Sequence, residues 1–187
     1  MAGNPRSLLS HPIQFTTYGP VLAFPVNDMV SLSSIPINHA VGSSVAKLGT
    51  WGGDGGSNHD ITVAPRRLES ITTHSGDVVD SIAFAYRDRD KILQTAGPWG
   101  GKGGNEKTIS LGPSEFVTEV VGTVGQKGKL HVVTSLKFVT NRDAYGPFGK
   151  AEGTAFSVPV LNNGSIVGFF ARAGDYLDAV GFYILPF

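Results

Sequence analysis

Two short segments of the chain carry the residues best suited to chemistry. Residues 76–80 and 174–178 both read Gly-Asp-x-x-Asp, and an apolar run follows each of them. Paired carboxylates can serve as the general acid and base of a glycosidase, but that reaction places them on opposite sides of a scissile bond. Asp77 and Asp80 instead lie three residues apart in one loop, where they alternate with backbone donors. The pattern therefore favours binding of a ligand over catalysis.

A second repeated feature is an aromatic residue followed by glycines. It occurs in residues 50–56, 98–104 and 147–153, and the spacing of about fifty residues indicates three similar β-units. Each motif taken alone is typical of a tight turn, because glycine adopts positive φ and Gly-Asp often precedes a strand. The interleaving of both motifs is harder to obtain from turn preference. It predicts repeated ligand sites, with Trp51 and Trp99 packed beneath the loops rather than in the sites.

The elements that must position these segments are β-strands. Twenty-five glycines and eleven prolines separate short runs of Val, Ile, Phe and Thr, which is typical of many strands joined by turns. Ile82, Phe84 and Tyr86 alternate with alanines at a period of two. No window has a comparable helical stripe, so we predict an all-β fold. The predicted strands are residues 68–73, 81–87, 107–111, 116–123, 130–140, 155–161, 165–171 and 179–185.

Composition argues against several functional classes. Lys plus Arg and Asp plus Glu each total 15, so no net charge attracts nucleic acid or an anionic membrane, and a neutral ligand is expected. The chain has no cysteine for a disulfide or a thiolate metal site. Its five histidines lack metal-ligand spacing, and Lys102 lacks the following Ser or Thr of a phosphate loop. We therefore expect no cofactor, no metal and no enzymatic activity.

The first 46 residues differ from the remainder. Prolines recur in them, serines cluster and turn signals lie close together. We predict an N-terminal extension over residues 1–46, part of which packs on a main domain over residues 47–187. The start of the chain lacks the apolar core of a signal peptide, and no run reaches the roughly 18 apolar residues of a membrane span. A cytoplasmic protein without membrane insertion is expected.

Residues of about 47 to 187 resemble the jacalin-related lectins, and most closely the mannose-specific branch of monocot plants, which includes banana lectin. The resemblance is carried by the segments Leu-Gly-Thr-Trp-Gly-Gly, Ala-Tyr-Gly-Pro-Phe-Gly, Val-Gly-Phe-Phe-Ala-Arg and Gly-Asp-Tyr-Leu-Asp-Ala-Val-Gly, at residues 48–53, 144–149, 167–172 and 174–181. It implies a β-prism, in which three four-stranded antiparallel Greek-key sheets surround a pseudo-threefold axis. It also implies a non-catalytic lectin that recognises mannose, glucose and high-mannose glycans, with a role in plant defence.

The resemblance also implies which residues bind sugar. Its first site consists of Gly56, Asp175, Tyr176 and Asp178, and its second site of Gly104, Asp77, Val78 and Asp80. The first assignment requires the two ends of the domain to meet, as they do in a closed prism. The counterpart loop of the third unit, residues 125–129, has lysines and no carboxylate, so we expect no equivalent site there.

Sugar preference and partners follow from the same resemblance. Galactose-specific relatives are cleaved so that a glycine becomes a new N-terminus, whereas Gly49, Gly52 and Gly53 lie inside a continuous chain. Mannose- or glucose-containing glycans are therefore the expected partners. Dimerisation through an exposed sheet would multiply the sites. The alternative is a protein-binding scaffold that contacts its partner through residues 1–46 or a sheet edge.

Overall fold

A computed structural model describes residues 44–186 of the chain. Most of the predicted extension over residues 1–46 lies outside the described residues. The described part consists of strands and connections and contains no helix, so none is long and apolar enough to cross a lipid bilayer. The strands are β1 (Ala46–Gly52), β2 (Ser57–His59), β3 (Pro65–Ser75), β4 (Val79–Asp88), β5 (Leu93–Gly100), β6 (Asn105–Ser110), β7 (Val117–Lys127), β8 (Leu130–Thr140), β9 (Ala144–Gly149), β10 (Thr154–Pro159), β11 (Ser165–Ala173) and β12 (Leu177–Leu185). The all-β prediction is confirmed.

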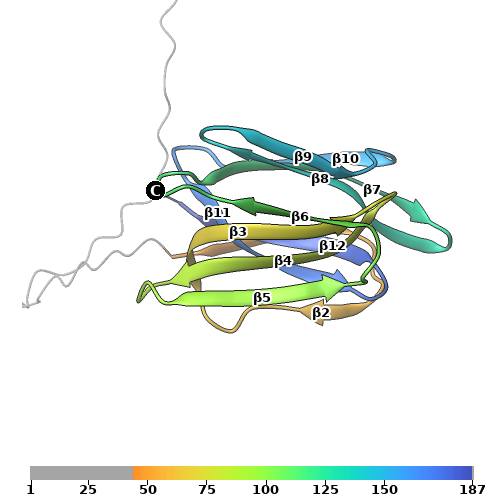
Figure 1. Cartoon of the computed structure of the whole chain (residues 1–187), viewed down its shortest axis with the longest axis horizontal. Coiled ribbons are helices and arrows are strands. Elements are labelled where there is room, and N and C mark those ends of the chain that lie inside the picture. Colours follow the sequence, from red (N-terminus) through yellow and green to blue (C-terminus); the bar gives the residue numbers. More distant parts are fainter. Residues whose placement is uncertain (1–43, 187) are drawn as a thin grey trace, which may run out of the picture. The chain divides into compact units, whose positions relative to one another are not determined.

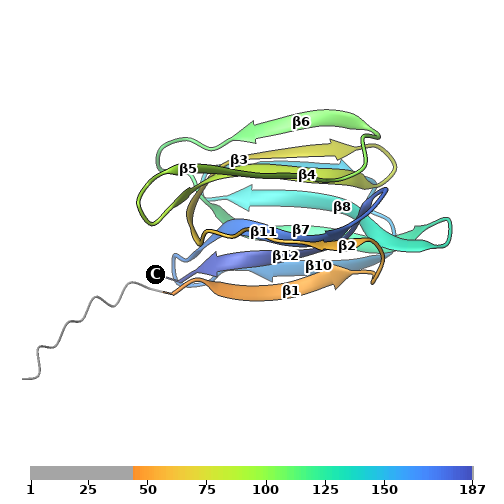
Figure 2. The same ribbon diagram turned by 90° about the horizontal axis from the view of Figure 1, so that it is seen from below.

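The strands pair into two antiparallel sheets (Figures 1 and 2). The smaller has four strands in the order β5-β4-β3-β6. The larger has eight, in the order β1-β12-β11-β7-β8-β9, with β2 paired to β11 and β10 paired to β7. Its two halves are joined through one residue pair, Ile166 with Val117. The hydrogen bonding thus gives one sheet of eight and one of four, where three separate sheets of four were predicted.

Buried aromatic rings from different strands meet in the core. Phe169 of β11 lies 5.0 Å from Phe84 of β4, 5.9 Å from Phe138 of β8 and 5.9 Å from Phe182 of β12, measured between ring centroids. The period-two pattern of β4 explains one of these contacts, since Ile82, Phe84 and Tyr86 are all buried. Both sheets therefore share a single apolar core. The loops that connect their strands lie at the two ends of this core.

Four strands were not predicted from the sequence, namely β1, β2, β5 and β9. Three of them carry the aromatic-glycine motifs, which were interpreted as loops: β1 ends at Gly52, β5 at Gly100 and β9 at Gly149. Each of these three strands is at the end of a strand order. An edge strand pairs on one side only, so it tolerates the glycines and prolines that weaken a central strand.

Candidate functional site

The first predicted site forms where the two ends of the domain meet. β1 pairs with β12, and the Gly53 amide donates to the Asp178 carbonyl oxygen at 2.8 Å. The Asp178 side chain packs directly against the glycine-rich segment: a Cβ added at Gly55 would lie 2.4 Å from its Oδ1, and one at Gly56 would lie 2.6 Å from its Oδ2. The expected meeting of Gly56 with Asp178 is thus present in the structure.

The second predicted site repeats this arrangement within the four-stranded sheet. The Gly101 amide donates to the Asp80 carbonyl oxygen at 3.0 Å. A Cβ added at Gly103 would lie 2.3 Å from Asp80 Oδ1, and one at Gly104 would lie 2.8 Å from Oδ2. Gly104 has a φ of 67° and Gly56 a φ of 59°, a left-handed conformation that glycine adopts without a steric penalty. Both carboxylates are therefore held against a bare backbone.

Burial gives the two acids similar electrostatics. Asp178 is 2% exposed and Asp80 is 7% exposed. Desolvation raises the pKa of the Asp178 carboxyl above its ordinary value, although the Gly174 amide and the Arg172 charge oppose the shift. Desolvation likewise raises the pKa of Asp80, against the charges of Lys127 and His74. Burial removes water from each carboxylate and so disfavours its charged form. The ionised carboxylate is therefore a strong hydrogen-bond acceptor for a ligand that reaches it.

The remaining predicted residues lie in the turns before these acids. The Gly174 amide donates to the Tyr176 carbonyl oxygen at 3.0 Å, and the Gly76 amide donates to the Val78 carbonyl oxygen at the same distance. In each turn it is the glycine amide that donates this bond, and not the amides of the two residues that follow the glycine. Those two residues are the predicted donors, Asp175 and Tyr176 in the first site and Asp77 and Val78 in the second, and each pair lies in the turn that precedes the acid of its site. The Val78 side chain is buried, whereas Tyr176 is half-buried.

The third unit has the same backbone contacts but a different side chain. A Cβ added at Gly149 would lie 2.2 Å from the Thr134 carbonyl oxygen, just as one at Gly52 would lie 2.1 Å from that of Asp178. Thr134 therefore occupies the position of the acid. Its hydroxyl donates to the Glu152 carbonyl oxygen at 2.6 Å and bonds with the Thr123 hydroxyl. The predicted lack of an acid in the 125–129 loop agrees with this arrangement, although the residue at the acid position is Thr134, beyond that loop.

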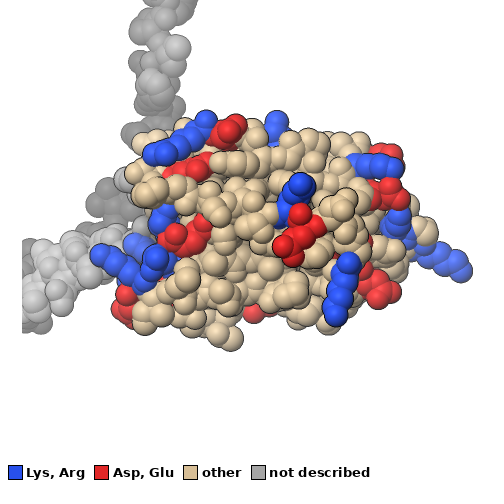
Figure 3. Space-filling model, viewed as in Figure 1, with Lys and Arg blue, Asp and Glu red and all other residues tan. Residues whose placement is uncertain are grey.

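The three regions adjoin one another at one end of the domain. A Cβ added at Gly101 would meet the Asp175 carbonyl oxygen at 2.1 Å, and one at Gly53 would meet that of His131 at 2.2 Å. The Lys150 amide donates to the Asp77 carbonyl oxygen at 3.3 Å, so the third region also contacts the second. Figures 1 and 2 show the corresponding connections at the end where the β7–β8 hairpin projects, and Figure 3 shows that both acidic and basic side chains lie at this end, as they do elsewhere on the same face.

Sequence reasoning missed the side chain that holds the first glycine segment. The Arg172 guanidinium donates to the carbonyl oxygens of Asp54 at 2.7 Å, Gly55 at 2.9 Å and Gly56 at 3.0 Å. It also donates to Asn58 Oδ1 at 2.8 Å. Arg172 precedes the Gly-Asp motif by two residues. This closeness to the motif was the signal in the sequence that could have marked Arg172 as part of the site. It fixes the loop on which Gly56 depends.

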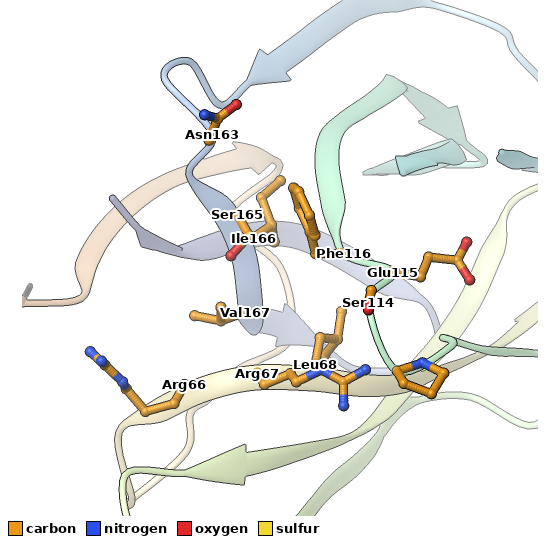
Figure 4. Close-up of a pocket in the computed structure, with 11 residues that line it drawn as sticks. Arg66, Arg67, Leu68, Ser114, Glu115, Phe116, Asn163, Ser165, Ile166 and Val167 are labelled. Atoms are coloured by element: carbon orange, nitrogen blue, oxygen red, sulfur yellow. The ribbon is translucent and has the colours of Figure 1, made fainter. Parts of the chain in front are cut away.

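A cavity of about 180 Å³ lies at the junction of β3, β11 and the β6–β7 connection (Figure 4). Two of its charged side chains already serve the fold: Arg67 donates to Glu69 and to the Gly112 carbonyl oxygen, and Glu115 accepts from Thr140 and Tyr145. Among residues 44–186, no group of three His, Asp or Glu side chains is placed to hold a metal ion. The paired acids remain the best candidate site.

The comparison with protein families agrees with this geometry. A model of the jacalin-like lectin domain matches residues 48–183, which include both acid sites and the third unit. The chain belongs to the jacalin-like lectin family. Lectins bind carbohydrate without converting it, so this member is a sugar-binding protein and not an enzyme.

Individual relatives support the assignment. The chain is similar to horcolin from Hordeum vulgare subsp. vulgare, with 48% identity over 145 residues that cover 77% of this chain and 99% of horcolin. It is 42% identical to a mannose/glucose-specific lectin from Parkia pendula over 74% of this chain and 32% of that protein. Among solved structures, it resembles a mannose binding jacalin related lectin from Ananas comosus, with a TM-score of 0.74 and 42% identity over 76% of this chain and 99% of the other.

Proposed function

We propose that this jacalin-like lectin binds mannose and glucose units, including those of high-mannose glycans, at two sites per chain. The first site comprises Gly56, Asp175, Tyr176 and Asp178, and the second comprises Gly104, Asp77, Val78 and Asp80. One observation carries the proposal: each buried carboxylate lies against two successive glycines, with a turn of backbone amides beside it.

The arrangement suits the chemistry of a pyranose. Neighbouring sugar hydroxyls both donate and accept, so a site needs an acceptor for two hydrogen bonds and donors fixed in space. The Asp178 carboxylate supplies the acceptor, and charge-assisted bonds of this kind are roughly twice as strong as neutral ones. The amides of Asp175 and Tyr176 supply donors. Glycine at position 56 lets the sugar approach the backbone closely.

We further propose that the domain, residues 47–187, is a β-prism of three four-stranded sheets with pseudo-threefold symmetry. Two observations support it. The halves of the eight-stranded sheet share one residue pair only, so each half is close to an independent set of four strands. A Cβ added at Gly52, Gly100 or Gly149 would also lie at nearly the same distance, 2.1, 2.1 or 2.2 Å, from the carbonyl oxygen of Asp178, Asp80 or Thr134. In this proposal the prism domain begins at residue 47, and residues 1–46 are its N-terminal extension.

Two observations favour mannose and glucose over galactose. The similar proteins from Parkia pendula and Ananas comosus are described as mannose/glucose-specific and as mannose binding. In this chain, Gly49, Gly52 and Gly53 are internal residues, and β1 continues through the first two of them. The described chain is continuous through these glycines, so none of them is an amino terminus that could bind the axial hydroxyl of galactose.

Titration of the isotopically labelled protein with methyl α-mannoside, followed by backbone amide NMR shifts, tests the proposal. A shallow site that holds one ring is expected to bind at about millimolar concentration, roughly 4 kcal/mol. The amides of Gly56, Asp175 and Tyr176 should shift, and those of Gly104, Asp77 and Val78 should form a second group. The amide of Gly153, which is the counterpart of Gly56 and Gly104 in the third unit, should not shift. Methyl α-galactoside is the control, and a larger response to galactoside, or none to mannoside, would contradict the proposal.

A further inference from the structure

The two acid sites differ in the charged side chains around them. The glycine-rich segment contains Asp54 at the first site and Lys102 at the second. Asp77 of the second site forms ion pairs with Lys150 at 2.6 Å and Lys127 at 3.1 Å. Its counterpart Asp175 forms no ion pair within residues 44–186. The same backbone arrangement is thus presented in two electrostatic settings.

The two lysines come from the third unit, which borders the second site. A Cβ added at Gly149 would lie 3.2 Å from the Val78 carbonyl carbon, so the segment that leads to Lys150 touches the predicted donor turn. Lys127 is at the end of β7, and its charge acts on the Asp80 carboxylate as well as on Asp77. The Lys127 ammonium is therefore within electrostatic reach of a sugar held by Asp80, and the Lys150 ammonium lies on Asp77 of the same site.

Each of these lysines keeps binding capacity. An ammonium group has three donors, and each lysine spends one contact on a separate oxygen of Asp77. The Lys127 side chain is 35% exposed and that of Lys150 is 59% exposed, so an anion in solution can reach them. Two cations share the Asp77 carboxylate there, and the Glu152 charge also acts on Lys150.

The first site has more acids than cations. Asp175 and Asp178 belong to it, Asp54 lies in its glycine-rich segment, and Arg172 is the cation whose charge acts on Asp178. The Arg172 guanidinium already donates to the loop carbonyl oxygens and to Asn58. An anionic ligand would therefore meet three acids and one arginine at the first site. At the second site the acids Asp77, Asp80 and Glu152 are matched by the cations Lys102, Lys127 and Lys150.

We propose that the Asp80 site takes mannose or glucose units that carry an anionic substituent, a phosphate or a carboxylate, whereas the Asp178 site takes neutral units. The substituent contacts Lys127 and Lys150 while Asp80 accepts from the ring hydroxyls. This inference rests on the proposed function, because it assumes that both sites bind a pyranose.

Single-site variants test the inference by calorimetry in a buffer of about 20 mM ionic strength, where screening is weak. Asp178→Ala leaves the second site and Asp80→Ala leaves the first. Asp178→Ala should bind mannose 6-phosphate about tenfold more tightly than methyl α-mannoside. Asp80→Ala should bind the phosphate more weakly than the mannoside. Glucuronic acid against glucose is the carboxylate arm, and a preference in either arm supports the inference.

Lysine variants show whether the named residues cause the preference. In the Asp178→Ala background, Lys127→Gln with Lys150→Gln should remove the preference, so that mannose 6-phosphate and methyl α-mannoside bind this variant within about twofold of each other. Lys91→Gln is the matched control, since Lys91 lies in the β4–β5 turn at the other end of β4. Amide shifts of Gly104 and Gly56 in the unmodified protein separate the sites even if a variant folds poorly.

The outcomes separate the inference from the proposed function. If Asp178→Ala binds methyl α-mannoside and shows no gain from phosphate or carboxylate, the inference is wrong and the proposed function stands. If the unmodified protein binds no mannoside at all, the proposed function is wrong. Equal gains from phosphate at the Asp178 and Asp80 sites would also overturn the inference.

Discussion

The two acid sites and the Thr134 region have the same backbone contacts and different side chains at one position. Gly52, Gly100 and Gly149 each touch the carbonyl oxygen of that position, which is Asp178, Asp80 or Thr134. The two acids can accept from a ligand. The threonine hydroxyl is already bonded to Glu152 and Thr123. The comparison shows that the repeated glycines maintain the frame, whereas one side chain determines whether that frame can hold a sugar.

A second difference between the acid sites and the Thr134 region is the residue that faces the side chain at the acid position. Gly55 and Gly103 face the carboxylates of Asp178 and Asp80, and the corresponding residue of the third unit is Glu152. A side chain is tolerated at position 152 because Thr134 is shorter than aspartate and bonds to the Glu152 backbone instead. Glycine is thus required where the carboxylate occupies the space of a Cβ.

The largest effect is expected for Gly55→Ala. Its methyl group would overlap Asp178 Oδ1, which lies 2.4 Å from the ideal Cβ position, so the loop or the carboxylate must move. We expect sugar affinity at the first site to fall by about 1.5–3 kcal/mol, roughly 10- to 100-fold. Calorimetry with methyl α-mannoside measures the change, and Glu152→Ala is the matched control. Equal effects of the two substitutions would break the comparison.

A carboxylate introduced into the third unit should not create a site. In Thr134→Asp the new side chain cannot donate to the Glu152 carbonyl oxygen, and it would be buried beside Thr123. We expect the free energy of unfolding to fall by about 1–3 kcal/mol, as measured by urea denaturation, with no additional sugar bound. Thr134→Ser keeps the hydroxyl and should be milder. A third mannoside bound by Thr134→Asp would show that the acid alone is sufficient.

The smallest effect concerns the charge of Asp178. Burial raises the pKa of this carboxyl, so the folded chain binds its proton more tightly than the unfolded chain does. Ionisation therefore lowers stability as pH rises through the window between the two pKa values. Asp178→Asn removes this cost and should raise Tm slightly at neutral pH while weakening sugar binding. Asp90→Asn, in the β4–β5 turn, is the control. A lower Tm for Asp178→Asn alone would contradict the assignment.

The same shift predicts the pH dependence of binding. The sugar needs the ionised carboxylate, so affinity at the first site should decline with acidification, starting above the ordinary aspartate range. The decline is followed by calorimetry of the Asp80→Ala variant, in which the first site alone remains. Affinity that is constant down to the ordinary aspartate pKa would exclude Asp178 as the acceptor.

The sequence was sufficient to predict the strands of the core. The assignment of Asp178 and Asp80 as the acids of the candidate site stays a prediction. The alternation of Ile82, Phe84 and Tyr86 identifies a buried strand face without further information. It was not sufficient for β1, β5 and β9, because their glycines and prolines are signals of turns and only pairing at a sheet edge makes them strands.

The meeting of Gly56 with Asp178 was predicted from the resemblance, since residues so far apart give no local signal. Arg172 and the lysines that pair with Asp77 were missed for a related reason. Their partners are 50 residues away for Lys127 and as many as 118 for Arg172, and such contacts depend on tertiary structure. Periodicity and motif spacing describe local geometry only.

The central claim is that Asp178 and Asp80 each hold one sugar and that the Thr134 region holds none. Calorimetric titration with methyl α-mannoside at high protein concentration tests it most directly. We predict a stoichiometry of two for the unmodified chain, one for either Asp178→Ala or Asp80→Ala, and no binding for the double variant, with the fold of each checked by circular dichroism. A stoichiometry of three, or residual mannoside binding by the folded double variant, would contradict the account.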